Sequence, residues 1–182
     1  MILVFFSGKL SLLFKRFVSA PATIDKRTLV GTFEVLPRQF DISFDFKATF
    51  WAGSKELTSI IRFTATKKDG AHGLAVLLTK RKFTIFSSAS EHIYSNEIIL
   101  DKWYNIRVTQ YFANWFWRFK VYVDGNLLKE WSNSKPEELK NVHVWIGDEV
   151  ITPQPGFLKN IRVFGKTIHL RLSKDTLHLK IP

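Results

Sequence analysis

The sequence contains no cysteine, so neither a disulfide framework nor a thiolate nucleophile or metal ligand can be built from it. It has no Asn-x-Ser/Thr acceptor for glycosylation, and no apolar run long enough to cross a bilayer as a helix. Acidic residues are few, with 16 Asp and Glu against 27 Lys and Arg. The 182 residues are 46% hydrophobic and include 17 Phe, which excludes a disordered chain and suffices for one domain with a sizeable core.

The formal net charge of +11 favours polyanionic partners such as sulfated glycans, anionic membrane surfaces or nucleic acid. The same charge is explained equally well by the solubility of an exposed sheet surface. No nucleic-acid recognition motif occurs in the sequence, so nucleic acid is not an expected partner.

Residues 1–27 form an N-terminal segment with two interpretations. Its apolar stretches, Met1–Phe6 and Leu10–Phe14, fit two strands that turn at Ser7-Gly8. Alternatively, the small residues Val18–Ala20 fit the cleavage site of a secretion signal, although basic residues interrupt the apolar stretches and none precedes them. Residues 28–182 are expected to form the main domain.

From residue 28 onward, apolar and polar residues alternate with a period of two. The clearest case is Phe40–Trp51, where the apolar side chains at even positions from Phe40 to Phe50 share one face and the polar side chains at odd positions share the other. This alternation predicts half-buried antiparallel strands. Further strands are expected at 28–35, 57–66, 74–78, 83–86, 92–95 and 142–146.

The chain end, Thr167–Ile181, has the pattern of a hairpin and is expected to pair with the N-terminal segment. Lys135–Lys140 is the one segment that suits a single helical turn, because Pro136 begins it and two glutamates follow near its positive end.

Residues 101–125 carry the most informative pattern. Trp103 opens a strand with Ile106 and Val108 on one face, and the next strand alternates up to the tight-turn signal Asp124-Gly125. The alternation predicts a sandwich core formed by Phe40, Ile42, Phe44, Phe46, Trp103, Ile106, Val108, Phe119, Val121 and Val123.

This pattern resembles the laminin-G-like branch of the concanavalin-A-like lectin jelly rolls. The resemblance rests on Trp103, Ile106 and Val108, on Val121–Gly125, and on two further motifs, Leu36–Phe44 and Pro155–Ile161. It covers roughly residues 30–165. It implies an all-β, two-sheet antiparallel jelly-roll sandwich.

The resemblance also implies a non-catalytic extracellular module for recognition or adhesion, which binds a glycan or a protein surface. Two alternatives remain open at this point: a glycan-active hydrolase or lyase with a divergent site, and a structural matrix protein. The oligomeric state is left open by the sequence.

Catalytic patterns are missing. Hydrolases on this fold use acids spaced as Glu-x-Asp-x-x-Glu, and the nearest approximation here, Asp41 with Asp45, lacks that spacing. The five histidines show no metalloenzyme spacing, and no Gly-x-Ser-x-Gly elbow occurs. We therefore expect no enzymatic activity.

Calcium is the one cofactor that the resemblance brings into consideration, since several laminin-G-like domains hold it at one rim of the sandwich. Hard cations prefer several oxygen ligands. The candidate ligands are Asp148 and Glu149, with Asp101 and Asp124 behind them.

Basic residues are the main candidates for ligand binding, because sulfate and carboxylate groups match Arg forks and Lys point charges. Lys67-Lys68 and Lys80-Arg81-Lys82 are expected in turns, and Arg62, Arg107, Arg118 and Lys120 on a shared polar strand face. Trp115, next to a turn at Asn114, is the expected exposed ring for stacking a sugar. A sulfated polyanion is the ligand that fits this set best.

Overall fold

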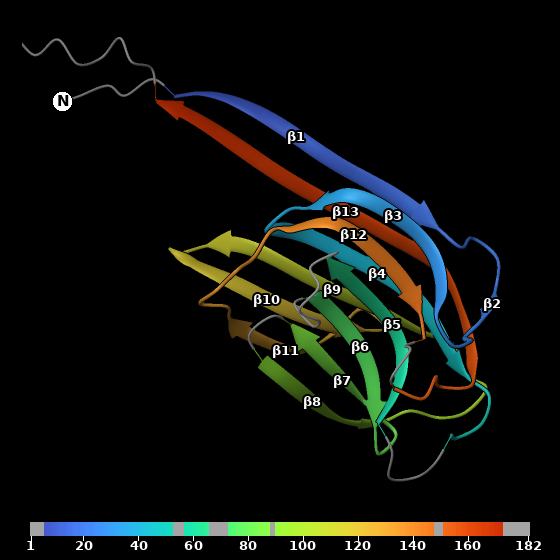
Figure 1. The fold of residues 1–182 in the computed structure, drawn as a ribbon. Helices are drawn as coiled ribbons and strands as arrows, with labels where there is room; N and C mark the ends of the chain where they lie inside the picture. The colour runs from blue at the N-terminus through green and yellow to red at the C-terminus, as the bar shows by residue number, and fades with distance from the viewer. Residues whose placement is uncertain (1–5, 53–56, 66–72, 88–89, 148–150, 173–182) are drawn as a thin grey trace, which may run out of the picture.

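Two antiparallel sheets pack face to face in the computed structural model of the protein, which describes residues 6–52, 57–65, 73–87, 90–147 and 151–172 (Figure 1). This confirms the predicted all-β sandwich. The strands are β1 (Phe6–Phe17), β2 (Ala22–Thr23), β3 (Thr28–Leu36), β4 (Gln39–Ala48), β5 (Leu57–Ala65), β6 (Gly73–Thr79), β7 (Lys82–Ser87), β8 (Ser90–Glu97), β9 (Tyr104–Ala113), β10 (Phe116–Val123), β11 (Asn126–Ser132), β12 (Leu139–Ile146) and β13 (Gly156–Leu172).

The seven-stranded sheet has the order β1-β13-β4-β9-β10-β11, with β2 also paired to β13, and the six-stranded sheet has the order β3-β12-β5-β6-β7-β8. Neighbours such as β13 with β4 and β12 with β3 are far apart in sequence, so the sandwich is held together by long-range pairing. No helical segment in the described part of the chain has the length and apolarity that a membrane crossing needs.

The core follows the predicted alternation. Every even position from Phe40 to Ala48 on β4 is buried, and the odd positions between them are partly exposed. Across the interior, the Phe46 ring meets Phe83 of the other sheet edge-on, with 5.9 Å between centroids. The predicted core residues Ile106, Val108, Phe119 and Val121 are buried as well, and Val123 packs against the core.

Two aromatic residues depart from this prediction. Trp103 precedes β9 and lies beside Lys47 and Lys159, whose ammonium groups are 5.4 and 4.1 Å from its ring. Because Lys47 belongs to the outward-facing set of β4, the prediction that Trp103 is a core residue is wrong. Phe50 is 59% exposed because β4 ends at Ala48 and the alternation no longer applies beyond that residue.

The N- and C-terminal strands are neighbours, as predicted. β1 pairs with β13 continuously from Phe6 opposite Leu172 to Phe17 opposite Ile161. The expected turn at Ser7-Gly8 is therefore wrong: both residues lie inside one long strand, whose pairing to β13 replaces the local hairpin. Beyond Lys166, β13 no longer pairs with β4, and the two terminal strands continue as a projecting ribbon (Figure 1). The expected hairpin at 167–181 lies partly outside the described residues.

Lys135–Lys140, the one segment that suited a single helical turn, does not form one. Leu139 is buried and pairs with Leu36, and Lys140 pairs with Val35, as the start of β12. The apolar contact of Leu139 with the core outweighs the local preference for a helix start at Pro136, because a single turn gains little without packing.

Candidate functional site

The outer face of the β9–β10 hairpin carries three cation–aromatic pairs, one after another along the strands. Two of them cross the hairpin, with the cationic group of Arg107 5.7 Å from the ring of Tyr122 and that of Lys120 5.3 Å from the ring of Tyr111. The third lies within β10, where the cationic group of Arg118 is 5.6 Å from the ring of Phe116. All six side chains point to the outer face of the sheet, because they alternate along β9 and β10 with the residues that are buried in the core. We call this row the cation–aromatic ladder.

A shallow depression of about 280 Å³ lies beside the ladder, over β4, β9, β10 and β13. Its lining includes Asp41, Arg107, Lys120 and the rings of Tyr111, Tyr122 and Phe164. Aromatic rings thus flank a group of hydrogen-bonding charges, as in sites that take amphipathic ligands. A larger groove of about 860 Å³ lies between β1 and the β3–β12 edge, but its lining mixes Lys15 with Glu34 and Glu138 and contains no comparable set of paired groups.

Asp41 and Arg107 form a fork-like ion pair in this depression. Arg107 Nε donates to both carboxylate oxygens at 2.9 and 3.0 Å, and Nη2 donates to Oδ2. The hydrogen bond to Asp41 raises the pKa of Arg107 above its usual value. Both side chains are partly exposed, so the pair contributes little to stability and serves mainly to fix the positions of its N–H donors.

Lys120 is held in place by two neighbours. Its Nζ lies 3.4 Å from Glu130 Oε2 and next to the Tyr111 ring. The hydrogen bond with the Tyr111 side chain, followed by that with Glu130, raises the pKa of Lys120 above its usual value. The amine is therefore fully protonated at physiological pH and can donate to a ligand in the depression.

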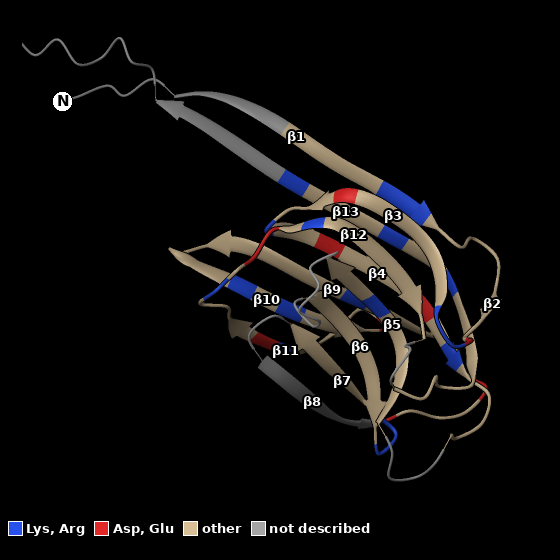
Figure 2. Cartoon of the chain, viewed as in Figure 1, with Lys and Arg blue, Asp and Glu red and all other residues tan. Residues whose placement is uncertain are grey.

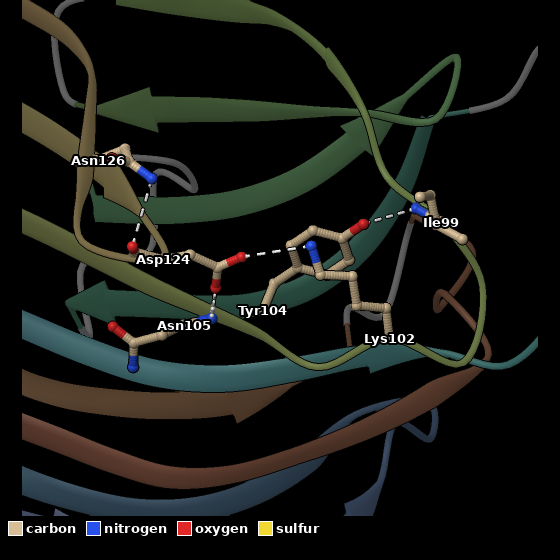
Figure 3. A network of polar contacts seen from close by, with 6 residues as sticks. All are labelled: Ile99, Lys102, Tyr104, Asn105, Asp124 and Asn126. Carbon is tan, nitrogen blue, oxygen red and sulfur yellow. Dashed lines mark hydrogen bonds and ion pairs between the residues drawn. The ribbon is translucent and has the colours of Figure 1, made fainter.

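Asp45 belongs to a separate polar network that is built from amides. Asn160 Nδ2 and Asn105 Nδ2 donate to its two oxygens at 2.7 and 2.8 Å. The backbone N–H of Asn105 donates to Asp124 Oδ1 at 2.8 Å, and Asp124 also faces Lys102 at 3.7 Å (Figure 3). Asp41, Asp45 and Asp124 thus each have fixed partners.

Trp115 is the most exposed large hydrophobic side chain of the described residues, at 88%. It occupies the second position of the two-residue turn between β9 and β10, where Asn114 and Trp115 have φ values of 50° and 66°. Such a turn favours glycine at this position, as in the Asp124-Gly125 turn between β10 and β11. A bulky residue with positive φ is strained, and strain of this kind often marks a functional position.

Replacing Trp115 with glycine is therefore expected to raise the free energy of unfolding by about 1 kcal/mol, because the left-handed conformation no longer meets a side chain. Trp115→Ala is the matched control: it removes the same ring but keeps a Cβ in the strained position, so its stability should stay near that of the wild type. Urea unfolding measures both. A glycine variant no more stable than the alanine variant would show that the turn is not strained.

The structure brings some of the predicted basic residues together and separates others. Arg118 and Lys120 share the ladder on the seven-stranded sheet, and Arg107 joins them. Lys80 and Arg81 form the β6–β7 turn and Lys82 begins β7, all in the six-stranded sheet. Arg62 lies on β5 of that sheet too, so the prediction that it shares a face with Arg118 is wrong.

Four predicted residues, Lys67, Lys68, Asp148 and Glu149, lie outside the described residues. No cluster of three or more His, Asp or Glu able to hold a metal ion occurs within the part of the chain that the structure describes. The calcium site therefore stays a prediction.

Sequence reasoning missed the contributions of Tyr111, Phe164 and Asp41 to the depression. Tyr122 can be placed with Arg118 and Lys120 from the sequence, because the three alternate with apolar residues along β10. The missing signal is the order of strands: Asp41 reaches Arg107 because β4 lies next to β9, and Phe164 arrives on β13 from the far end of the chain.

No protein-family model matches the chain, and no curated protein matches it. Solved structures with a similar fold include domain 4 of AbnA, a GH43 extracellular arabinanase from Geobacillus stearothermophilus, in complex with arabinotriose. That domain is 14% identical over 84% of this chain and 82% of its own, with a TM-score of 0.56.

The Ruminococcus gnavus IT-sialidase CBM40 bound to α2,3-sialyllactose is also similar, at 8% identity over 88% of this chain and 92% of its own, with a TM-score of 0.51. Trypanosoma rangeli sialidase matches at 20% identity over 69% of this chain, with a TM-score of 0.53, and the match covers a fifth of the sialidase (20%). These similarities show a two-sheet β-sandwich fold, which the carbohydrate-binding module CBM40 among them also has.

Proposed function

We propose that the protein is a non-catalytic carbohydrate-binding module of the concanavalin-A-like, laminin-G-like lectin type, and that a glycan lies along β9 and β10 on the outer face of the seven-stranded sheet. The observation that carries the proposal is the cation–aromatic ladder beside the depression over Asp41 and Arg107. A sugar presents an apolar C–H face and a rim of hydroxyl groups, and this surface offers partners for both.

The chemistry of the ladder suits an extended sugar chain. Phe116 and Tyr122 are six residues apart on β10, which corresponds to roughly 20 Å along the strand. Rings along this length can stack successive sugars, while Arg107, Lys120 and Arg118 donate hydrogen bonds between them. The exposed Trp115 lies in the turn at the tip of the same hairpin.

The similar structures support the same proposal. Two of them are carbohydrate-binding domains whose structures contain arabinotriose or α2,3-sialyllactose. We extend from this to an extracellular module for recognition or adhesion, whose net charge of +11 favours acidic or sulfated glycans over neutral ones. Lys and Arg segments recur along β10 and β13 of the seven-stranded sheet (Figure 2).

The acids on this face favour binding over hydrolysis. Asp41 and Asp45 are four residues apart on one strand, so their Cα atoms are roughly 14 Å apart. Glycosidases place their two carboxyl groups about 5–10 Å apart. Asp41 is also occupied by Arg107, and Asp45 by two amides. We therefore propose that the protein turns over no polysaccharide.

A glycan array tests the proposal, with the wild type compared with Tyr111→Ala/Tyr122→Ala. Each aromatic contact contributes about 0.5–1.5 kcal/mol, so loss of both rings should weaken binding by about tenfold or more. Phe50→Ala is the matched control, because it removes an exposed ring that lies off the ladder and should leave binding unchanged. An array on which the wild type binds no glycan would contradict the proposed function.

A further inference from the structure

Arg16 and Arg162 lie directly opposite each other on β1 and β13. Both are exposed on the outer face of the seven-stranded sheet. Like charges in this arrangement destabilise a sheet, because the Cβ atoms of opposed residues are only about 5 Å apart. An anion bound between the two arginines would relieve this repulsion.

The acids closest to this pair on the same face are already engaged. Arg162 is opposite Ser43 of β4, which is flanked on its outward face by Asp41 and Asp45. Asp41 is bound by Arg107, and Asp45 by the amides of Asn105 and Asn160. Among the described residues, the one hydrogen bond of the Arg16 guanidinium is a long one of 3.5 Å to Asn160 Oδ1. The pair is thus left with excess positive charge.

The backbone at this place is irregular in a way that presents these side chains. The pairing of β13 with β4 shifts between Lys159 and Arg162, which is the mark of a β-bulge. Within it, Asn160 has a φ of 54°, and its N–H donates to Val18 O at 2.6 Å. Bulges often redirect a side chain next to a binding site. Here the bulge places Asn160 between Arg16 and Asp45.

An exposed aromatic pair adjoins the arginines. Phe14 and Phe164 are opposite each other two residues along the same strands, and they are 67% and 41% exposed. Phe164 also lines the depression beside the cation–aromatic ladder. A continuous surface therefore leads from the arginine pair across Phe164 to Tyr111 and Tyr122.

We infer that Arg16 and Arg162 form an anion-binding site for the carboxylate or sulfate group of an acidic glycan, whose sugar rings continue over Phe164 into the depression. This inference rests on the proposed function and names the ligand's acidic group and the residues that bind it. Two guanidinium forks can hold one planar or tetrahedral oxyanion with several charge-assisted hydrogen bonds. The bound anion also removes the repulsion between the two arginines.

The first test is independent of any glycan. Sodium sulfate and sodium acetate are titrated separately into the labelled protein at constant ionic strength, with chloride as the exchanged anion, and the Nε–Hε signals of arginine are followed by NMR. Both anions are expected to shift the signals of Arg16 and Arg162 more than that of Arg107, which Asp41 already occupies. Equal shifts of all arginine signals, or no shift, would overturn the site.

The second test uses oligosaccharides that differ in their acidic group: a heparin-derived hexasaccharide, a hexameric oligogalacturonate and a neutral galactan hexamer. Arg16→Gln/Arg162→Gln should weaken binding of the acidic probes by about tenfold or more, as expected for lost charged hydrogen bonds. Lys135→Gln/Lys140→Gln is the matched control, because it removes the same charge from exposed positions in and before β12 of the other sheet. The galactan hexamer should bind both variants equally.

Each outcome separates the inference from the proposed function. Equal losses in the two double variants would mean that net charge alone attracts the probes, and would overturn the site. If the wild type binds the neutral and acidic hexamers equally well, the inference fails while glycan binding stands. Tighter binding of duplex DNA or of anionic vesicles than of the heparin hexasaccharide overturns the glycan assignment.

The thermal midpoint of Arg16→Gln/Arg162→Gln should equal or exceed that of the wild type, so lost binding cannot be attributed to unfolding.

Discussion

Replacing Phe44 with alanine is expected to lower the free energy of unfolding by about 3–5 kcal/mol. Phe44 is fully buried in the middle of β4, which lies between β13 and β9 in the seven-stranded sheet. Its backbone is paired with Ile106 on β9 and its ring fills space between the two sheets. Truncation leaves a cavity that the surrounding strands cannot close, because their positions are fixed by pairing on both sides.

Phe50→Ala is the matched control for this prediction. Phe50 continues the same sequence alternation but is 59% exposed, so its loss should change the free energy of unfolding by no more than about 0.5 kcal/mol. Urea unfolding followed by tryptophan fluorescence measures both variants. A similar loss of unfolding free energy in the two variants would mean that Phe50 is buried and that β4 continues beyond Ala48.

Replacing Gln154 with leucine is expected to lower the free energy of unfolding by about 1–3 kcal/mol, because the buried Thr58 hydroxyl and the partly buried Phe50 carbonyl lose their partner. Gln154 is 1% exposed and lies just before β13, where its backbone N–H donates to Ser59 O of β5. Its Oε1 accepts from Thr58 Oγ1 at 2.9 Å, and its Nε2 donates to Phe50 O at 2.7 Å and to Pro155 O at 3.2 Å. Leucine has a similar volume but can satisfy none of these groups.

The same substitution at Gln39 provides the control. Gln39 lies on the outer face of β4, partly exposed, and its side chain lines the depression without being buried. Gln39→Leu should therefore change stability by no more than about 0.5 kcal/mol. Thr58→Val should lie between the two, since it removes only the donor to Gln154. Thermal or urea unfolding of the three variants checks this order; a Gln154→Leu protein as stable as Gln39→Leu would contradict it.

The strands were predictable wherever side chains alternate. The pattern from Phe40 to Ala48 is a property of the sequence itself, and the structure repeats it as buried and partly exposed positions. Prediction failed where a neighbour distant in sequence decides the conformation. Ser7-Gly8 has the composition of a turn but pairs with β13 as part of an extended strand. Leu139 belongs to β12 because its side chain is buried in the core.

In the candidate site, too, local sequence patterns predict some residues, and others depend on neighbours that are distant in sequence. The face with Arg118 and Lys120 could be predicted because it lies on one strand, and Trp115 because it adjoins a turn. Asp41 beside Arg107 and Arg16 opposite Arg162 depend on the order of strands in the sheet and on the register of the two chain ends. Neither the order nor the register is encoded in a local pattern, so these residues could be identified only from the structure.

The location of the ligand is the central claim, and backbone-amide NMR mapping with the heparin-derived hexasaccharide tests it most directly. We expect the amide signals of β9 and β10 around Tyr111, Lys120 and Tyr122 to shift in a saturable way, together with those of β13 around Arg162 and Phe164. Signals of β5, β6 and β7, which belong to the other sheet, should stay in place. Shifts confined to the six-stranded sheet, or no saturable shift at all, would contradict the account.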